Sequence, residues 1–351
     1  MRTIGPQAIT RRALLAGAAT LAAITQAGAA SPPPAAATPA LIAAARAEGK
    51  IAWYTADDLS LATKVVKAFE AKYGFSVQLE RSGAERIYQR ISQETASSIH
   101  ACDVVTSSDL SYLLTWSKEG RLVSYLPAEA AQWPPEAQGP DSFYIVDKFT
   151  LVVAGYNTRL VKPEEAPKSW ADLLDPKWKG KMVKGHPGYS GALTTATFVL
   201  SRALGWEFFE KLAKQSVMQT QSATDPPNRV AQGERAVMAD AAEVSTLRLI
   251  GTGAPLAIVY PREGVPVVPV ASSVMVKAPH PNAARLFLHF LASKEGQQIN
   301  IESGARVYSP EVATPASWTP LAAMKLIHSD PAALAEEAAA VRKRYTQIFG
   351  V

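Results

Sequence analysis

The sequence predicts an α/β fold in which two lobes are joined by a hinge, and three observations lead to this fold class. The chain has 351 residues, more than a single hydrophobic core usually organises. Short apolar strands alternate with amphipathic helices through short turns, which is the pattern of a mostly parallel sheet. Two β-rich runs, residues 149–154 and 265–276, interrupt that pattern. Two such crossings would connect the lobes and form the hinge.

Residues 1–30 have the pattern of an export signal. Arg11 and Arg12 directly precede an apolar run that extends to about Thr25, and small residues suited to a signal peptidase follow it. The run is too short to span a bilayer, so it predicts a cleaved signal rather than an anchor. The paired arginines favour the twin-arginine route and a mature protein in the periplasm. Residues 31–40, rich in proline and alanine, are expected to form a short leader.

Charge and cysteine content limit the possible function classes. Lys and Arg number 36 against 31 Asp and Glu, and three of those arginines lie in the first thirty residues. The remaining excess is too small to predict nucleic-acid binding. Cys102 is the only cysteine, so neither an internal disulfide nor a lipid-modified N-terminal cysteine is expected. His100 and Cys102 alone make a poor metal site, so we expect a buried thiol, no metal site and no cofactor.

The first lobe is expected to begin near Leu41, where an amphipathic helix opens. Further along, Leu61, Val65 and Phe69 mark one face of a helix that ends before Gly74, a residue suited to a left-handed cap. The predicted elements after the first helix are a strand at 51–54, a helix at 61–73, a strand at 76–79, a helix at 87–99 and a strand at 103–106.

Polar loops follow these three strands. Parallel strands bring their carboxyl ends to one edge of a sheet, which is where ligands gather. Serine and aspartate are also preferred helix N-caps, so any single loop has an equally good structural explanation. Three such loops at one edge favour a polar cleft. The candidate ligand-binding residues here are Tyr54, Thr55, Asp57, Ser82, Gly83, Ser108 and Asp109.

The second lobe resumes the α/β pattern between about Lys181 and Val259. Prolines in the second β-rich run confine it to an edge or a crossing, and it is expected to return the chain to the first lobe. The predicted boundaries are 41–148 and 262–310 for lobe 1, 149–261 for lobe 2, and 311–351 for a C-terminal helical segment that packs on the lobes.

Seven segments carry a resemblance to a known family when they are taken together in order. The most distinctive is APKSWADLLDPKWKGK at 166–181, whose tryptophans and leucines we expect to pack against the core. The others are GKIAWYTA at 49–56, DVV at 103–105, YNT at 156–158, SGA at 190–192, GERAV at 233–237 and GVP at 264–266. From Gly49 to about Tyr308 the chain resembles bacterial extracellular solute-binding proteins of family 1, in particular the ferric-iron-binding-protein-like branch. This resemblance implies a type II periplasmic-binding-protein fold, ligand capture between the lobes and delivery to the membrane permease of an ABC importer.

The segment KGHPGYSGA at 184–192 is the sharpest candidate for ligand binding. Glycine allows close approach of the backbone, and the N–H groups of a helix from Leu193 onward would point into the cleft toward a phosphate or carboxylate. In iron-binding relatives the matching Ser-Gly-Ala segment holds the anion that accompanies the metal. The structural alternative is a glycine-rich turn with a serine N-cap. The candidates are His186, Tyr189, Ser190, Gly191 and Ala192, joined by Gln221 from a later loop.

The sequence departs from the ferric-binding pattern of that branch at one segment. Its members commonly carry adjacent tyrosines shortly after the segment that corresponds to GERAV, because Fe(III) favours anionic oxygen ligands. This chain continues VMADAAEV, without a tyrosine. Asp240 and Glu243 remain candidate ligand-binding residues, able to supply oxygen to a metal or to accept from ligand hydroxyls or an amine. The alternative for both is an ordinary surface position.

The sequence therefore predicts the solute-binding component of an ABC importer, a monomer that traps a small organic anion or phosphorylated compound by hinge closure. Its expected partners are that solute and the permease. A ferric-iron-binding protein is the alternative. A periplasmic enzyme on the same scaffold is a further alternative, yet the sequence contains no nucleophile elbow, P-loop, zinc-protease motif or dinucleotide fingerprint, so we expect no enzyme.

Overall fold

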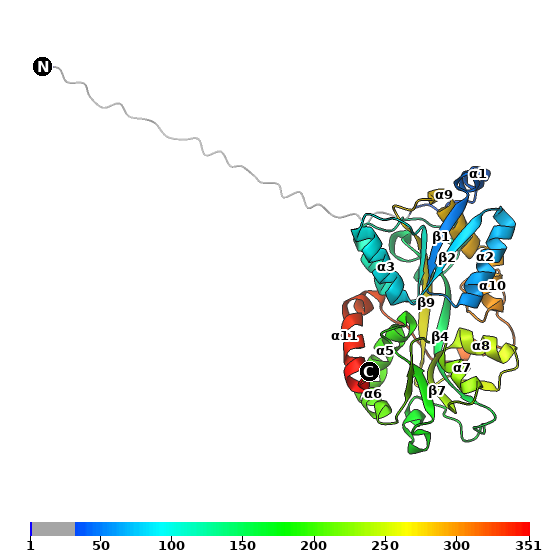
Figure 1. Ribbon diagram of the computed structural model, residues 1–351, viewed down its shortest axis with the longest axis vertical. Helices are drawn as coiled ribbons and strands as arrows, with labels where there is room; N and C mark the ends of the chain where they lie inside the picture. The colour runs from blue at the N-terminus through cyan, green and yellow to red at the C-terminus, as the bar shows by residue number, and fades with distance from the viewer. Residues whose placement is uncertain (2–31) are drawn as a thin grey trace. The chain divides into compact units, whose positions relative to one another are not determined.

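The computed structural model describes Met1 and residues 32–351, and the latter form one compact unit with two lobes stacked along its long axis (Figure 1). Apart from Met1, the predicted export signal lies outside the described residues. Within residues 32–351, none of the helices has both the length and the apolar character needed to cross a membrane.

Lobe 1 is built on three parallel strands with β1 in the middle, flanked by β2 and β3. The helix predicted to end before Gly74 does so, and Gly74 adopts a left-handed φ of 79°. The next helix, α3, lies three residues earlier than predicted, because the chain turns at Ser97 and Ser98, where Ser98 has a φ of 55°. The elements are α1 (Pro39–Glu48), β1 (Lys50–Thr55), α2 (Leu59–Tyr73), β2 (Ser76–Arg81), α3 (Ala84–Ala96), β3 (Val104–Ser107) and α4 (Leu110–Lys118), followed by 3-10 turns at Ala128–Ala130, Pro135–Ala137 and Pro140–Ser142.

The lobe 1 core is completed by helices that come much later in the chain, α9 (Pro281–Ala292) and α10 (Lys294–Glu302). Phe287 of α9 lies 5.0 Å from Trp53 and 4.9 Å from Phe69, measured between ring centroids. Phe290 of the same helix lies 5.4 Å from Phe69. Cys102 is buried in this core, as predicted.

Two long strands, β4 (Ile145–Asn157) and β9 (Val265–Val274), cross between the lobes. They pair with each other antiparallel, and the sheet runs in the order β2-β1-β3-β9-β4-β7-β5-β6. The prediction of a mostly parallel sheet therefore holds inside each lobe and fails at the crossing, where β9 also runs antiparallel to β3. Pro269 of β9 lies at this crossing, opposite Phe149 of β4.

Strand β4 is irregular at two places along the crossing. Its register shifts between Val146 and Lys148 against β9, and again between Val153 and Gly155 against β7. Such bulges bend a strand and increase its twist. The two lobes are therefore connected by a strand with a bend near each of its ends.

Lobe 2 surrounds the parallel strands β5, β6 and β7. Trp170 and Trp178 are buried here beside Met182 and Phe209, which confirms that the distinctive 166–181 segment packs against the core. The elements are 3-10 turns at Ala171–Leu174 and Pro176–Trp178, then β5 (Met182–Gly185), α5 (Gly191–Leu204), α6 (Trp206–Ala213), β6 (Met218–Thr220), α7 (Pro226–Ala231), β7 (Val237–Ala242), α8 (Glu243–Gly251) and β8 (Leu256–Val259).

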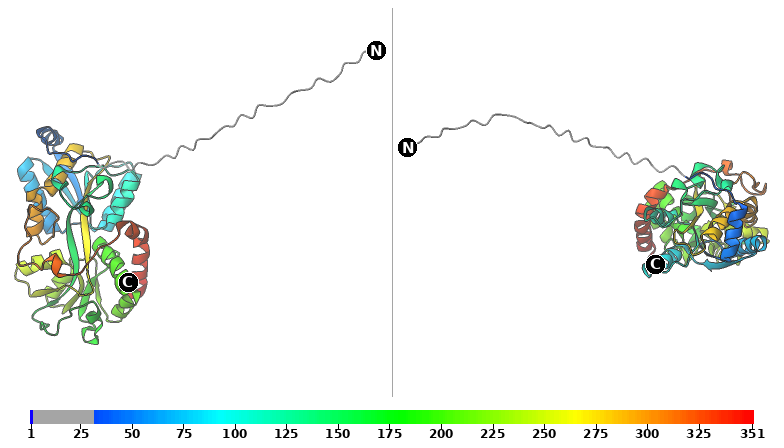
Figure 2. Two further views of the ribbon diagram at one scale, coloured as in Figure 1. Left: turned by 180° about the vertical axis from the view of Figure 1, so that it is seen from behind. Right: turned by 90° about the horizontal axis from the view of Figure 1, so that it is seen from above.

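After α10 the chain passes the crossing a third time. Phe149 of β4 and Arg306 exchange two backbone hydrogen bonds of 2.8 and 3.0 Å. A 3-10 turn at Leu321–Ala323 and strand β10 (Leu326–Ile327) follow, and the described chain ends with helix α11 (Pro331–Phe349). Helix α11 lies along one side of the molecule next to α5 (Figure 2).

Candidate ligand-binding site

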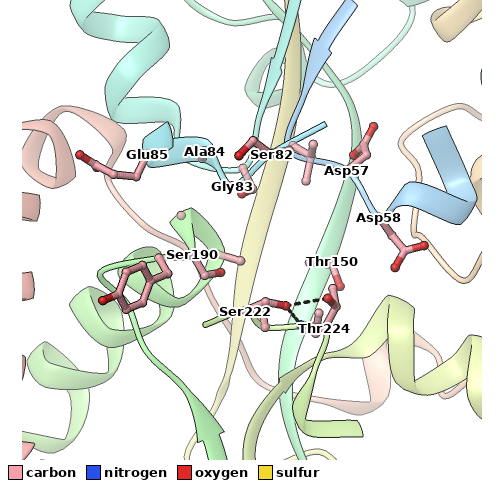
Figure 3. A pocket seen from close by; sticks show the side chains of 18 of the residues that line it. Asp57, Asp58, Ser82, Gly83, Ala84, Glu85, Thr150, Ser190, Ser222 and Thr224 are labelled. Carbon is pink, nitrogen blue, oxygen red and sulfur yellow. Dashed lines mark hydrogen bonds between the residues drawn. The ribbon is translucent and has the colours of Figure 1, made fainter. Parts of the chain in front are cut away.

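A cavity of about 510 Å³ lies between the lobes, at the carboxyl ends of the strands of lobe 1. This size suits a small molecule. Figure 3 shows Ser82 and Gly83 of lobe 1 across the cavity from Ser190, Ser222 and Thr224 of lobe 2. The lining comprises 56–58, Leu61, 81–86, Gln89 and Ser108 from lobe 1, 188–192, 221–224, Ala242 and Val244 from lobe 2, and 148–150, Val270 and Ala305 from the crossing segments.

Two helices, one from each lobe, begin at this cavity. Helix α3 starts after Gly83 and helix α5 after Ser190, and neither N-cap residue caps its helix with a side-chain hydrogen bond. The first N–H groups of a helix have no partner within the helix, so these groups are available to a ligand. The helix dipoles add partial positive charge at the same ends.

The two helix starts lie side by side. A Cβ atom placed on Gly83 would lie 2.8 Å from the carbonyl oxygen of Tyr189, one residue before the N-cap of α5. A Cβ atom on Gly191 would lie 2.7 Å from the Cβ atom of Asp109 in lobe 1. Glycine is needed at both positions because backbone from opposite lobes meets there. Together the helix starts make one region in which an anion can accept several N–H bonds.

Hydroxyl groups surround this region from both lobes. Ser222 and Thr224 hydrogen bond to each other over 2.7 Å, and the backbone N–H of Thr224 donates to Ser222 Oγ over 2.9 Å. These bonds fix the loop that faces the helix starts. Ser82, Ser108, Thr150 and Ser190 also line the cavity. Hydroxyls both donate and accept, so they suit phosphate oxygens and sugar hydroxyls alike.

The acidic residues of the lining are already paired. Asp57 Oδ2 lies 3.0 Å from Lys148 Nζ, Asp58 caps helix α2 through a 2.9 Å bond from Ser60 N, and Glu85 accepts a hydrogen bond from the Tyr112 hydroxyl. Arg81 and Arg86 line the same cavity. With Lys148 these arginines balance the three acids, so the partial positive charge of the two helix starts is what favours a ligand with negative charge.

Lys148 holds its charge in a buried position on β4. Its ammonium lies 2.7 Å from Asp147 Oδ2 as well as 3.0 Å from Asp57, and all three side chains are buried. Burial alone opposes the charge, but the two carboxylates outweigh it and raise the pKa of Lys148. Burial raises the pKa of Asp147, and Lys148 acts against this shift.

Nine of the fifteen candidate residues from the sequence line the cavity. The structure brings together the polar ends of the first three strands and the glycine-rich segment before α5, as well as the later loop that contains Gln221. These nine residues are Asp57, Ser82, Gly83, Ser108, Tyr189, Ser190, Gly191, Ala192 and Gln221.

Asp240 and Glu243 lie outside the lining because both carboxylates are used by buried partners. Asp240 Oδ2 lies 3.0 Å from Lys184 Nζ, and Oδ1 accepts a 2.9 Å bond from Gly185 N. Glu243 binds the guanidinium of Arg306 through contacts of 2.8 and 2.9 Å and accepts a 2.6 Å bond from Tyr260. These ion pairs connect strands of lobe 2 and join lobe 2 to the third crossing segment, and they engage both carboxylates.

The remaining four candidates also lie outside the lining. Tyr54 donates to Glu94 over 3.0 Å, Thr55 Oγ1 accepts from Asp57 N over 3.1 Å, and Asp109 caps α4 through a 3.0 Å bond from Ser111 N. The structural explanation of ordinary capping therefore applies to Asp109. The fourth residue is His186.

His186 lies behind the cavity wall and is neutral. Gly188 N donates to its Nδ1 over 2.9 Å, so the ring proton is on Nε2. Burial and the nearby Lys184 ammonium lower the pKa of His186. Its ring packs edge-on against Tyr345, with 5.0 Å between the ring centroids.

Sequence reasoning missed several lining residues. Thr150 was part of a run interpreted only as a crossing strand, Lys148 was placed just before that run at the end of lobe 1, and Thr224 follows the loop at Gln221 and Ser222 that was considered for anion contact. The available signal for Lys148 was its position directly before a β-rich run, because a charged residue is rarely buried without a partner.

Within residues 32–351, no group of three or more His, Cys, Asp or Glu side chains is arranged to hold a metal ion. Among the tyrosines of residues 32–351, Tyr189 alone is part of the cavity lining. The donor set at this cavity is therefore dominated by hydroxyls and backbone N–H groups, which suit an anion better than a hard cation.

Comparison with known proteins gives one family and several relatives. Residues 51–306 match the family model described as bacterial extracellular solute-binding protein. A Haemophilus influenzae protein described as uncharacterized is 26% identical over 280 residues, which cover 76% of this chain and 79% of the relative. The probable ABC transporter periplasmic-binding protein y4fP of Sinorhizobium fredii is 30% identical over 160 residues, 41% of this chain and 42% of the relative.

Solved structures share the fold. The periplasmic binding protein AfuA from Actinobacillus pleuropneumoniae, with fructose-6-phosphate bound, has a TM-score of 0.79 and 23% identity, covering 86% of this chain and 99% of that one. Iron-bound HitA from Pseudomonas aeruginosa has a TM-score of 0.73 and 23% identity, covering 84% and 99%. Both resemblances identify the architecture as the type II periplasmic-binding-protein fold.

Proposed function

The chain belongs to the bacterial extracellular solute-binding proteins, the substrate-binding components of ABC importers, and on that premise we propose that its solute is a small organic anion or phosphorylated compound captured in the periplasm. The observation that carries this proposal is the pair of adjacent helix starts, α3 and α5, which come from opposite lobes and face one cavity.

The position of these helix starts explains how an anion would promote closure. An anion that accepts N–H bonds from both helices gains all of them only when the lobes are together. A ligand shifts a two-state equilibrium by its difference in affinity for the two states. The bent strand β4 and its partner β9 provide the hinge for such a motion.

A phosphate ester or carboxylate with hydroxyl groups suits the rest of the lining. The serine and threonine hydroxyls of both lobes are spread around the helix starts, and Phe149, Leu61 and Val270 supply apolar surface for the body of a ligand. The similar structure AfuA has fructose-6-phosphate bound, which supports the class without identifying the solute of this chain.

The test uses matched pairs of phosphate esters and their dephosphorylated parents, beginning with fructose 6-phosphate and fructose, in isothermal titration with purified protein. Native mass spectrometry of protein isolated from periplasm gives a parallel identification of retained solute. We expect binding by the anionic member of a pair only. Equal binding of both members would refute the anion proposal.

A titration with ferric salt distinguishes this proposal from the main alternative, a ferric-iron-binding protein. That alternative arises because iron-bound HitA shares the fold. Visible absorption from tyrosinate bound to iron would favour an iron receptor. Turnover of a bound ester by the purified protein would instead favour an enzyme. We expect neither signal, because the acids nearest the expected metal position are paired with Lys184 and Arg306.

A further inference from the structure

Helix α11 contacts both lobes. It packs against α4 of lobe 1 and against α5 and α6 of lobe 2. Figure 1 shows α11 beside α5 and α6, with its upper end directed toward α3. It is therefore a connection between the lobes in addition to the three crossing segments, and it runs outside the sheet.

The apolar side of α11 belongs to lobe 2. Leu334, Ala338 and Val341 form a buried cluster with Phe198 and Val199 of α5. No residue of α11 is part of the buried core cluster of lobe 1 among the described residues. Because apolar burial is the main favourable term, α11 is expected to move with lobe 2.

The end of α11 is anchored to lobe 2 by a buried polar network. The Tyr345 hydroxyl accepts a 2.7 Å bond from Lys184 Nζ and donates a 2.7 Å bond to Gln219. Both bonded groups lie in lobe 2, on β5 and β6. Rotation of lobe 2 would therefore carry α11 with it.

On the side of lobe 1 the ionic contact comes from Arg342. Its Nη1 lies 3.7 Å from Asp109 Oδ2, and its Nη2 lies 4.0 Å from Glu85 Oε2. Asp109 is fully buried, and Gly191 at the start of α5 lies directly against it. The contact is thus located where the two lobes meet, beside the paired helix starts.

We propose that Arg342 is a positioning residue for lobe closure: α11 carries it with lobe 2, and it joins Asp109 and Glu85 of lobe 1 only when the lobes are together. A buried carboxylate without a counter-charge is strongly unfavourable, whereas water solvates the same carboxylate once the lobes part. Arg342 therefore stabilises the closed form. It also offsets two negative charges beside the proposed anion site, and this second effect rests on the proposed function.

The matched control is Arg344, two residues further along the same helix. Its guanidinium lies 3.9 Å from Glu210 within lobe 2, and both side chains are about half exposed. Substitution of Arg344 removes the same charge from the same helix without touching lobe 1. Any difference between the two variants then belongs to the contact with Asp109 and Glu85.

The experiment measures the interlobe distance in protein without ligand. Spin labels at Gln93 in α3 and Lys214 after α6, both exposed, are placed in a Cys102→Ser background, and double electron–electron resonance gives the distance distribution. We expect Arg342→Gln to shift the population toward longer distances and Arg344→Gln to leave it unchanged. Arg342→Lys should restore part of the shorter population, and circular dichroism checks that each variant is folded.

Three outcomes would overturn the proposal: identical distributions for wild type and Arg342→Gln, an equal shift in Arg344→Gln, or a wild-type chain that shows only the longer distance. Affinity for fructose 6-phosphate is the second measurement. We expect Arg342→Gln to bind this compound more weakly than wild type, by a factor of up to about five. If the wild-type protein does not bind fructose 6-phosphate, that result counts against the ligand class given under the proposed function for this compound. The ligand-free distance distribution still decides the role of Arg342.

Discussion

Lys148 on the crossing strand and Asp57 on the first strand-end loop form a buried ion pair, with 3.0 Å between Nζ and Oδ2. The same ammonium lies 2.7 Å from Asp147, whose other oxygen accepts a 3.0 Å bond from Ser272 on β9. One lysine thus joins the cavity wall, the bulge in β4 and the second crossing strand. A change at this position affects all three.

Lys148→Met is expected to destabilise the protein strongly, because it leaves two buried carboxylates without their cation. Breaking a buried pair in this way costs about 3–5 kcal/mol. Urea unfolding followed by circular dichroism measures the loss. Lys211→Met removes an exposed pair with Glu207 and serves as the control, with no change in the unfolding midpoint expected. Equal midpoints for the two variants would show that the buried cluster does not stabilise the hinge.

Gly191→Ala is expected to weaken ligand binding about tenfold or more and to expand the protein. The added Cβ would lie 2.7 Å from the Cβ atom of Asp109, so α5 must move away from lobe 1. Titration with fructose 6-phosphate measures the affinity, and small-angle scattering measures the radius of gyration. Gly251→Ala is the control, since a Cβ there meets nothing within 4 Å. Unchanged scattering and affinity for Gly191→Ala would remove this contact from the closed form.

The buried, neutral His186 predicts a loss of stability in mild acid. Because burial and Lys184 lower its pKa in the native protein, only the unfolded chain takes up a proton just below the ordinary value of 6.5. The contribution of neutral His186 to stability is therefore fully present above pH 6.5. It is lost as the pH drops toward the lowered pKa of the native protein.

His186→Asn should remove part of this pH dependence, since asparagine does not titrate and can still accept from Gly188. Unfolding free energies at about pH 7.5 and about pH 5.5 give the difference for each variant. The control is His328→Asn at an exposed position. If both variants keep the wild-type difference, His186 is not its source.

Tyr345→Phe is expected to lower stability by about 1–3 kcal/mol, because Lys184 loses an acceptor and Gln219 a donor in a buried position. Hydrogen exchange should show faster opening of α11 than in wild type. Tyr73→Phe, a half-buried tyrosine whose hydroxyl makes no hydrogen bond with residues 32–351, is the control. Slow exchange of α11 in both variants would contradict the anchoring role of Tyr345.

The sequence predicted much of lobe 1 because its signals are local. The hydrophobic spacing of α2 and the glycine after it lie within fifteen residues of each other, so the helix and its end could be derived together. The polar strand ends were also visible, since parallel strands place them at one edge whatever the rest of the chain does.

Partners far apart in sequence could not be predicted. Asp240 and Glu243 were chosen as candidate ligand residues, yet their charges are taken by Lys184 and Arg306, 56 and 63 residues away. The spacing of residues along the chain does not indicate which distant residues will form such ion pairs. The role proposed for Arg342 has the same origin, because an arginine on a C-terminal helix gives no sign of which lobe it contacts.

The aromatic centre of lobe 1 has a consequence for the order in which the chain can fold. Trp53 and Phe69 are made early, but Phe287 and Phe290, whose rings pack against them in tilted or edge-on contacts, are made more than two hundred residues later. The whole of lobe 2 lies between these two sets. During synthesis, therefore, we expect lobe 1 to expose its core until α9 has been made. Lobe 2 in turn receives the apolar side of α11 only at the end of synthesis, so neither core is complete before α9, and fragments that end before α9 should remain sensitive to protease.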